Sequence, residues 1–237
     1  MGGAAAEHED NGGPAGKSAR RRVVDASDGI KTAPLTCVIA DDHPAVVDAV
    51  SRYLANHGIE VVDHARDGGE ALAKIEGLNP DVALIDLKMP GLDGVEVIRR
   101  ARRSAPNTAA VVYTAHADTP IVDEALDAGA RGLVLKAAPL PDLVRALEVV
   151  ATGSVYIDAV LAAGLAGRRS DGVPELSKRE REILRLLSHG NTNEEIGREL
   201  FISPETVRTH VRRAIAKLEA KTRTQAVATA LRNGLIT

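Results

Sequence analysis

Five polar side chains that are capable of phosphate or metal chemistry each follow a short apolar run. These runs, which we predict to be β-strands, span residues 35–40, 59–62, 82–85, 109–113 and 132–135. Asp41 and Asp42 follow the first run, Asp86 the third, Thr114 the fourth and Lys136 the fifth. Because ligands bind outside the carboxyl ends of strands in an open parallel sheet, we expect these side chains to converge on one edge.

Three carboxylates, a hydroxyl and an ammonium together suit phosphoryl transfer. Neighbouring carboxylates repel one another, so protons or a cation must neutralise them, and an oxygen-only cluster favours Mg²⁺. The adjacent Asp41 and Asp42 suit the metal, whereas Asp86 stands alone before the loop at 88–91 and suits the acceptor of a phosphoryl group. Thr114 and Lys136 would stabilise the charge on the transferred oxygens. A single Asp after a strand is usually a loop or capping residue. The prediction of a site therefore rests on finding such polar residues at four strand ends of one sheet.

The stretches between the apolar runs have the length and periodicity of helices. One contains Val46, Val47, Val50 and Leu54, and another, near Val95 and Ile98, turns several arginines outward. Strand alternating with helix five times predicts an α/β fold with a five-stranded, doubly wound parallel sheet of the flavodoxin-like kind. We expect this domain to span residues 35–152.

The motifs at these strand ends resemble the receiver domain of two-component response regulators over about residues 35–150. The matching segments are Asp41-Asp42-His43-Pro44, residues 86–94, Thr114-Ala115 and Leu135-Lys136. The resemblance implies that Asp86 accepts a phosphoryl group from a sensor histidine kinase. It also implies a Mg²⁺ site made by Asp41, Asp42, Asp86 and the backbone carbonyl of Lys88, with Thr114 and Lys136 contacting the phosphoryl oxygens.

One residue departs from the receiver pattern. The family usually has Tyr or Phe three residues before the final lysine, and here that position is Leu133. An aliphatic side chain can pack there, but it has no polar tip to exchange between water and core. The conformational switch is therefore expected to be weaker or differently connected, without an effect on phosphoryl acceptance.

Charge separates the predicted receiver domain from the C-terminal part of the chain. Residues 35–152 carry 11 Lys and Arg against 18 Asp and Glu, whereas residues 153–237 carry 14 against 10. An acidic domain joined to a basic one indicates different partners, and the basic segment is the candidate for nucleic acid. The glycine-containing stretch at 153–174 is interpreted as a linker with a short helix near 158–165.

Helix-start signals predict an all-α domain of four helices over residues 175–237. Ser177 to Glu180 and Thr192 to Glu195 are capping boxes, and Ser203-Pro204 places a capping residue before a first-turn proline. The predicted helices span residues 178–189, 193–200, 204–219 and 224–232. The connection at 201–203 is short enough for a helix-turn-helix motif, whose basic third helix could enter the DNA major groove. The alternative is a solvated basic helix in a small bundle.

The same segment resembles the LuxR-type helix-turn-helix domain. The matching segments are residues 176–184, 193–197, 202–211 and 217–218. With the receiver, the resemblance is to response regulators of the NarL/FixJ class. It implies that Arg208, Thr209 and Arg212 face base edges. Phosphate contacts are implied for Thr206, Arg213 and Lys217.

The resemblance also bears on pairing and on two departures from the pattern. In the family the last helix pairs with its mate, so Val227 and Leu231 are candidates for a homodimer contact, their alternative role being the domain core. Glu194 and Gly197 stand where the family more often has Lys and Ala, and Gly in a helix costs roughly 1 kcal/mol relative to Ala.

Composition excludes several other classes of protein. Cys37 is the only cysteine, which excludes a disulfide-stapled fold, and there is no tryptophan for base or sugar stacking. No apolar run reaches the roughly 18 residues of a membrane helix. Residues 1–34 are rich in Gly, Ala and charge, lack a signal-peptide core and are interpreted as a disordered tail. A soluble cytoplasmic protein is expected.

The sequence therefore predicts a DNA-binding transcriptional response regulator that is controlled by Mg²⁺-dependent phosphorylation of Asp86. Its expected partners are a sensor histidine kinase, double-stranded DNA and a second copy of itself. We expect no enzyme activity apart from slow loss of its own phosphoryl group. One alternative is a dimeric regulator that binds DNA without phosphorylation. A Mg²⁺-dependent phosphatase is disfavoured because Lys88 stands where such enzymes usually carry a second Asp.

Overall fold

The structure is a computed structural model of the 237-residue chain and describes residues 34–115, 119–165 and 175–237. Residues 34–237 form one compact unit. The predicted disordered tail lies outside the described residues except for Pro34, and so do residues 166–174 of the predicted linker.

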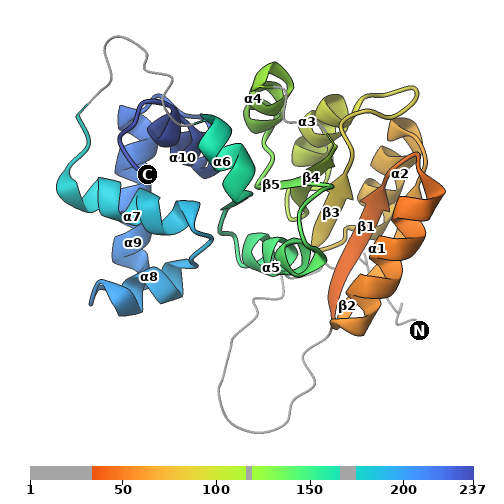
Figure 1. Cartoon of the computed structure of the whole chain (residues 1–237), viewed down its shortest axis with the longest axis horizontal. Coiled ribbons are helices and arrows are strands. Elements are labelled where there is room, and N and C mark those ends of the chain that lie inside the picture. The colour runs from red at the N-terminus through yellow and green to blue at the C-terminus, as the bar shows by residue number, and fades with distance from the viewer. Residues whose placement is uncertain (1–33, 116–118, 166–174) are drawn as a thin grey trace, which may run out of the picture. The chain divides into compact units, whose positions relative to one another are not determined.

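A parallel β-sheet forms the centre of the first part of this unit (Figure 1). Its strands are β1 (Leu35–Ala40), β2 (Ile59–Ala65), β3 (Val82–Ile85), β4 (Ala109–Thr114), β5 (Gly132–Leu135) and β6 (Tyr156–Ile157). The order across the sheet is β2-β1-β3-β4-β5-β6, and each neighbouring pair is parallel. The winding direction therefore reverses between β1 and β3, which places the carboxyl ends of these two strands at the switch point.

The sixth strand was not predicted from the sequence. Residues Tyr156–Ile157 lie in the segment interpreted as linker, but they pair with β5 through Gly132 and Leu133. Backbone bonds from Tyr156 N to Arg131 O (3.1 Å) and from Asp158 N to Leu133 O (2.8 Å) extend this pairing. A strand of two residues is too short to show an alternating pattern, so only the tertiary pairing reveals it.

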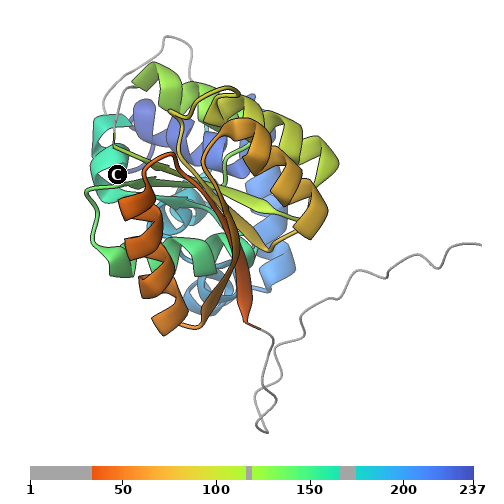
Figure 2. The ribbon, with the colours of Figure 1, turned by 90° about the vertical axis from the view of Figure 1, so that its right-hand side faces the viewer.

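Helices cover both faces of the sheet (Figure 2). The buried side chains of α1 (Pro44–Asn56) and α5 (Leu140–Ala151) pack on one face. The buried side chains of α2 (Gly68–Leu78), α3 (Gly94–Ser104) and α4 (Thr119–Ala128) pack on the other. The central strands β3 and β4 consist entirely of buried residues, as expected for a sheet that is covered twice, whereas the edge strand β2 is only partly buried.

Five helices lie among the described residues of the C-terminal part. They are α6 (Ala159–Leu165), α7 (Lys178–Ser188), α8 (Asn193–Glu199), α9 (Pro204–Lys217) and α10 (Arg223–Arg232). Both predicted capping boxes are formed. At the start of α9, the side-chain oxygen of Ser203 accepts a hydrogen bond from the backbone N–H of Thr206 at 3.1 Å. The predicted bounds of the last four helices are thus confirmed to within two residues. None of the described helices is long and apolar enough to cross a membrane.

Candidate functional site

An acidic cluster lies at the switch point of the sheet. Asp41 follows β1 and Asp86 follows β3, and a bond from Asp86 N to Ala40 O (2.8 Å) holds the two strand ends together. Ligand atoms of Asp41, Asp42, His43 and Asp86 all lie within 4.8 Å of one another. Asp41 is 2% exposed and Asp86 5%, so two of the carboxylates are buried. The predicted convergence of the three acids is thus present.

Lys136 bridges the two buried carboxylates. Its Nζ lies 2.7 Å from Asp86 Oδ2 and 2.7 Å from Asp41 Oδ2. Burial opposes the ammonium charge, but the two carboxylates outweigh this effect and hold the pKa of Lys136 above its ordinary value. Lys136 N also donates to Thr114 O at 2.7 Å, which brings the end of β4 beside the cluster, and Thr114 itself is buried.

The loop after β3 closes over Asp86. Lys88 N donates to Asp86 Oδ1 at 3.3 Å, and Gly94 begins α3 directly against the same loop. A Cβ at Gly94 would lie 2.1 Å from Asp86 O, so any other residue would push α3 away. A recess of about 480 Å³, lined by Asp42 and Lys88 among others, opens beside the cluster. The site is therefore accessible from solvent on this side.

The cluster fits a hard cation. Two of its oxygens, Asp41 Oδ2 and Asp42 Oδ1, are buried, and each has one basic group of the described residues at 2.7 Å, Lys136 Nζ and His43 Nδ1 respectively. One ammonium and one imidazole do not balance three carboxylates, so room remains for a further cation. His43, which directly follows the acid pair in the sequence, both occupies a capping position and contacts the two acids. His43 stands at the N-cap of α1, and its ring Nδ1 lies 3.2 Å from Asp41 Oδ1 and 2.7 Å from Asp42 Oδ1.

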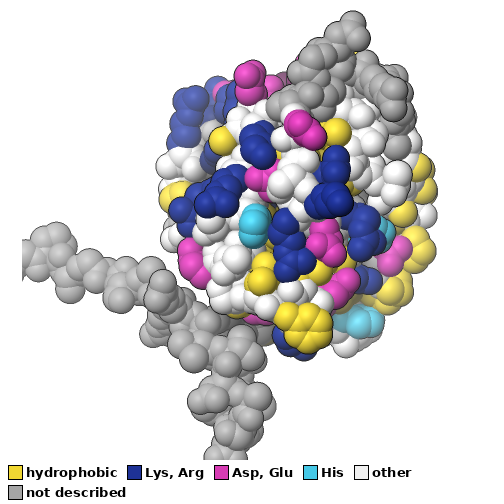
Figure 3. Space-filling model, turned by 90° about the vertical axis from the view of Figure 1, so that its left-hand side faces the viewer, with side chains coloured by type: hydrophobic (Ala, Val, Ile, Leu, Met, Phe, Trp, Pro, Cys, Tyr) yellow, Lys and Arg dark blue, Asp and Glu magenta, His cyan; other side chains and the backbone are white. Residues whose placement is uncertain are grey.

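The second candidate site is the exposed face of α9. Val207, Val211 and Ala214 are buried against the helical domain, as predicted. The opposite face exposes Thr206, Arg208, Arg212 and Arg213, with Thr209 half-buried. Figure 3 shows Lys and Arg side chains spread over the surface on this side of the molecule, with acidic side chains among them.

Two acidic residues engage several of these cations. Glu205 lies 3.0 Å from Arg208 and 3.3 Å from Arg212. Lys217, which the sequence indicated as a phosphate contact, lies 2.8 Å from Glu180 of α7. Burial opposes the Glu180 charge, but Lys217 and the capping bonds at Ser177 outweigh it and lower its pKa. The Glu205 pairs are exposed and weak, whereas Lys217 is tied to a carboxylate that is only 4% exposed.

The turn between α8 and α9 is closely packed. Ile202 N donates to Gly197 O at 2.9 Å, and Phe201 adopts a positive φ of 54°. A Cβ at Gly197 would lie 2.7 Å from Ile202 O. The glycine that departs from the usual Ala therefore allows this turn to close. The dimer candidates Val227 and Leu231 of α10 are buried within this chain, 0% and 4% exposed.

Comparisons with known proteins find relatives of both parts of the chain. Residues 37–148 match the model of the response regulator receiver domain, and residues 174–230 match the LuxR family of bacterial regulatory proteins. The chain is 39% identical over 204 residues to the probable transcriptional regulatory protein NarL of Mycobacterium tuberculosis, covering 84% of this chain and 94% of the relative. It is 36% identical over 206 residues to the transcriptional regulatory protein LiaR of Bacillus subtilis, covering 84% and 98%.

Solved structures give the same answer. A complex of the two-component response regulator RcsB with DNA matches with a TM-score of 0.53 and 26% identity, covering 84% of this chain and 98% of that one. The chain therefore belongs to the two-component response regulators, with a receiver domain followed by a LuxR-type DNA-binding domain. The fold class and the family resemblance inferred from the sequence are confirmed.

Proposed function

We propose that this response regulator is switched by phosphorylation of Asp86 and binds DNA through α9. The observation that carries the proposal is the position of Lys136, whose Nζ lies 2.7 Å from both Asp86 and Asp41 at the switch point of the sheet. A cation fixed beside a buried carboxylate can neutralise oxygens of a phosphoryl group attached there.

In the proposed step a carboxylate oxygen of Asp86 forms a bond to phosphorus of a phosphohistidine on the sensor kinase. The phosphorus–nitrogen bond breaks, and the nitrogen keeps the electron pair, so that an acyl phosphate and a free histidine result. Lys136 and the hydroxyl of Thr114 then hold the phosphoryl oxygens. Asp41, Asp42, Asp86 and the Lys88 carbonyl would hold Mg²⁺, which supplies further positive charge at the transferred group.

The output is proposed to be DNA binding by two copies of the chain. Arg208, Thr209 and Arg212 would read base edges in the major groove, and Thr206, Arg213 and Lys217 would contact phosphates. Lys217 would then contact a DNA phosphate while its ammonium group stays within ion-pair distance of Glu180. The acyl phosphate changes the charge at the carboxyl edge of the sheet and so biases a two-state receiver surface.

Mass spectrometry after treatment with a small phosphodonor and Mg²⁺ tests the acceptor. We expect the wild type to gain one phosphoryl group and Asp86→Asn to gain none. Asp48→Asn is the matched control, because Asp48 is an exposed aspartate on α1 away from the cluster. Phosphorylation of Asp86→Asn at wild-type yield would exclude Asp86 as the acceptor.

A second candidate is a regulator that binds DNA without phosphorylation. Leu133, at the position where the family usually has an aromatic residue, is 0% exposed and packed in the core between β4 and β6. Measuring DNA affinity before and after the phosphodonor discriminates the two. An increase favours the phosphorylation switch, and equal affinities favour this second candidate.

A further inference from the structure

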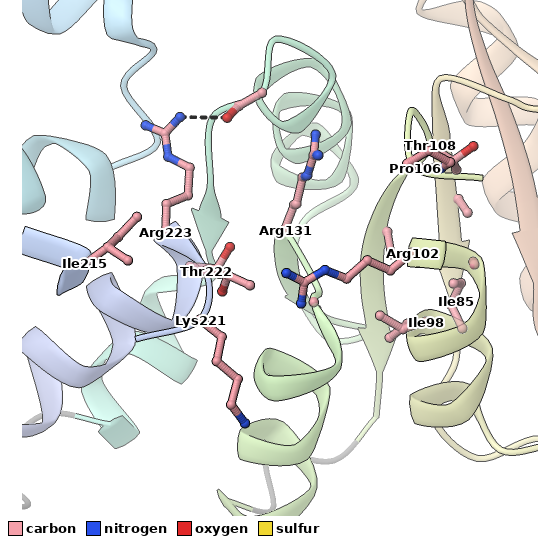
Figure 4. A pocket seen from close by; sticks show the side chains of 16 residues that line it. Ile85, Ile98, Arg102, Pro106, Thr108, Arg131, Ile215, Lys221, Thr222 and Arg223 are labelled. Atoms are coloured by element: carbon pink, nitrogen blue, oxygen red, sulfur yellow. Dashed lines mark hydrogen bonds between the residues drawn. The ribbon is translucent and has the colours of Figure 1, made fainter. Parts of the chain in front are cut away.

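A cationic cavity lies at the edge of the sheet opposite to the acidic cluster. Arg131 precedes β5, Thr108 precedes β4 and Gly153 precedes β6, so these residues mark the amino ends of the strands. The cavity measures about 420 Å³ and is closed on its other side by Ile215 of α9 and the start of α10 (Figure 4).

Positive charge accumulates around this cavity. Arg102 of α3 and Arg131 lie on the receiver side, and Lys221 and Arg223 lie on the DNA-binding side (Figure 4). The described residues that line the cavity include neither an acidic nor an aromatic side chain. Lys221 is paired with Asp127 at 3.1 Å, whereas Arg102, Arg131 and Arg223 form no ion pair with an acidic side chain of the described residues.

Two buried polar atoms at the cavity find no hydrogen-bond partner in the part of the chain that the structure describes. Arg223 donates to Gly153 O at 2.6 Å and to Asn193 Oδ1 at 3.0 Å, but its Nε is buried without a partner among the described residues. The hydroxyl of Thr224 is also unpartnered there, and Thr224 is 0% exposed. Both residues line the cavity. Buried donors without a partner are costly, so their presence around one cavity indicates a missing acceptor.

Burial of the cations, together with repulsion from neighbouring arginines, points in the same direction. Burial, with the charge of Arg102, lowers the pKa of Arg131. Burial, with the charges of Arg131 and Arg208, lowers the pKa of Arg223 to about 10. Thr222, Arg223 and Thr224 also form the first turn of the ten-residue helix α10, whose N-terminal end carries partial positive charge.

We propose that this cavity is a binding site for a small phosphate-bearing anion that bridges the receiver and DNA-binding domains. Planar guanidinium groups match phosphate oxygens bidentately, and three of them from two domains surround the cavity. The absence of an aromatic side chain among the described lining residues favours recognition of the phosphoryl groups themselves rather than of a stacked base. A bound anion would contact α3, β5 and α10 at once and so hold the two domains together.

Calorimetric titration of the full chain with inorganic pyrophosphate, without Mg²⁺ or DNA, tests the site. We expect saturable binding to the wild type and about tenfold weaker binding to Arg102→Gln and to Arg131→Gln, because each removes a charged hydrogen-bond donor. Arg103→Gln is the matched control, since Arg103 is the exposed neighbour on α3 and does not line the cavity. If Arg131→Gln does not fold, Arg102→Gln still tests the site, because the side chain of Arg102 is exposed and its replacement should not disturb folding.

Three outcomes would overturn the proposal. They are an absence of saturable binding to the wild type, an equal loss in Arg103→Gln, and loss of binding in Lys136→Gln, which removes the ammonium of the acidic cluster. The last would place the anion at the acidic cluster instead. Since the titration omits Mg²⁺ and DNA, its result is independent of whether Asp86 is the phosphoacceptor.

Discussion

At the scale of single residues, the receiver site depends on a balance between three carboxylates and one ammonium. Lys136 contacts Asp41 and Asp86, while the basic group beside Asp42 is the imidazole of His43. Without a second cation the carboxylates repel one another, and this repulsion lowers the stability of the folded state. A divalent ion that binds only the folded chain should therefore stabilise it.

We expect Mg²⁺ to raise the unfolding free energy of the wild type by about 2.7 kcal/mol at a concentration one hundred times its Kd. Asp42→Asn should lose most of this gain because a ligand is removed, and Asp48→Asn should keep it. Chemical denaturation with and without Mg²⁺ measures both. An equal gain in wild type and Asp42→Asn would place the ion elsewhere.

Cys37 provides a prediction about pH. The thiol is 0% exposed, and its burial raises its pKa to about 12, although a backbone hydrogen bond to Leu84 opposes the shift. Because the folded-state pKa lies above the unfolded value, this stabilisation is complete below about pH 8.5 and is lost as the pH rises towards the folded value.

The unfolding free energy of the wild type should therefore decrease more steeply between about pH 9 and pH 12 than that of Cys37→Ala. The comparison concerns the slopes, because the substitution also leaves a cavity that lowers stability at every pH. Denaturant titrations across this range measure the slopes. Parallel slopes would contradict a buried, protonated thiol.

At the scale of elements, the α8–α9 turn illustrates how tertiary packing overrides helix propensity. Gly197→Ala should reduce stability, because a Cβ would lie 2.7 Å from the Ile202 carbonyl oxygen. Gly77→Ala in α2 is the matched control, since no atom lies within 4 Å of its added Cβ. There Ala should stabilise by about 0.5–1 kcal/mol. Thermal unfolding of both variants measures whether the stability change has opposite signs at the two positions. A stabilised Gly197→Ala would contradict the prediction.

The exposed face of α9 should carry the electrostatic part of DNA binding. Arg213→Ala should lower affinity to a similar extent for all sequences and reduce the slope of log K against log salt by about 1. Arg103→Ala on α3 should leave that slope unchanged. Fluorescence anisotropy over a series of salt concentrations measures it. An unchanged slope for Arg213→Ala would remove this residue from the proposed phosphate contacts.

Sequence patterns predicted most of these elements, for a physical reason. Apolar runs such as Val82–Ile85 and capping boxes such as Ser177 to Glu180 are local signals, and the structure contains both. The two residues of β6 and the pairing of Lys217 with Glu180 depend on segments distant in sequence, so no local pattern indicates them. The cationic cavity was missed for the same reason, because its arginines come from three separate elements.

At the scale of the whole molecule, the position of α10 connects DNA binding to the receiver. Lys221 and Gln225 bond to Asp127 of α4, and Arg232 pairs with Asp123 of the same helix. Val227 and Leu231 are buried, so their role in this state is the domain core. A dimer contact through these two residues requires α10 to present a different face.

We therefore expect phosphodonor treatment to increase the mass of the wild type in solution and to leave Asp86→Asn unchanged. Light scattering coupled to size exclusion measures this. Asp48→Asn should behave as the wild type. If the dimer content is the same before and after treatment although Asp86 is phosphorylated, then phosphorylation does not control dimerisation.

The parallel sheet has acids near the carboxyl ends of its strands and arginines near the amino ends. The acids are Asp41 and Asp86, and the arginines are Arg102 and Arg131. This arrangement gives the receiver an electric polarity along the strand direction. Near a polyanion such as DNA, the field exerts a torque that turns the arginine end inward and the acidic end outward. A phosphoryl group added at residue 86 increases that polarity, so modification also changes how the molecule is oriented during its approach.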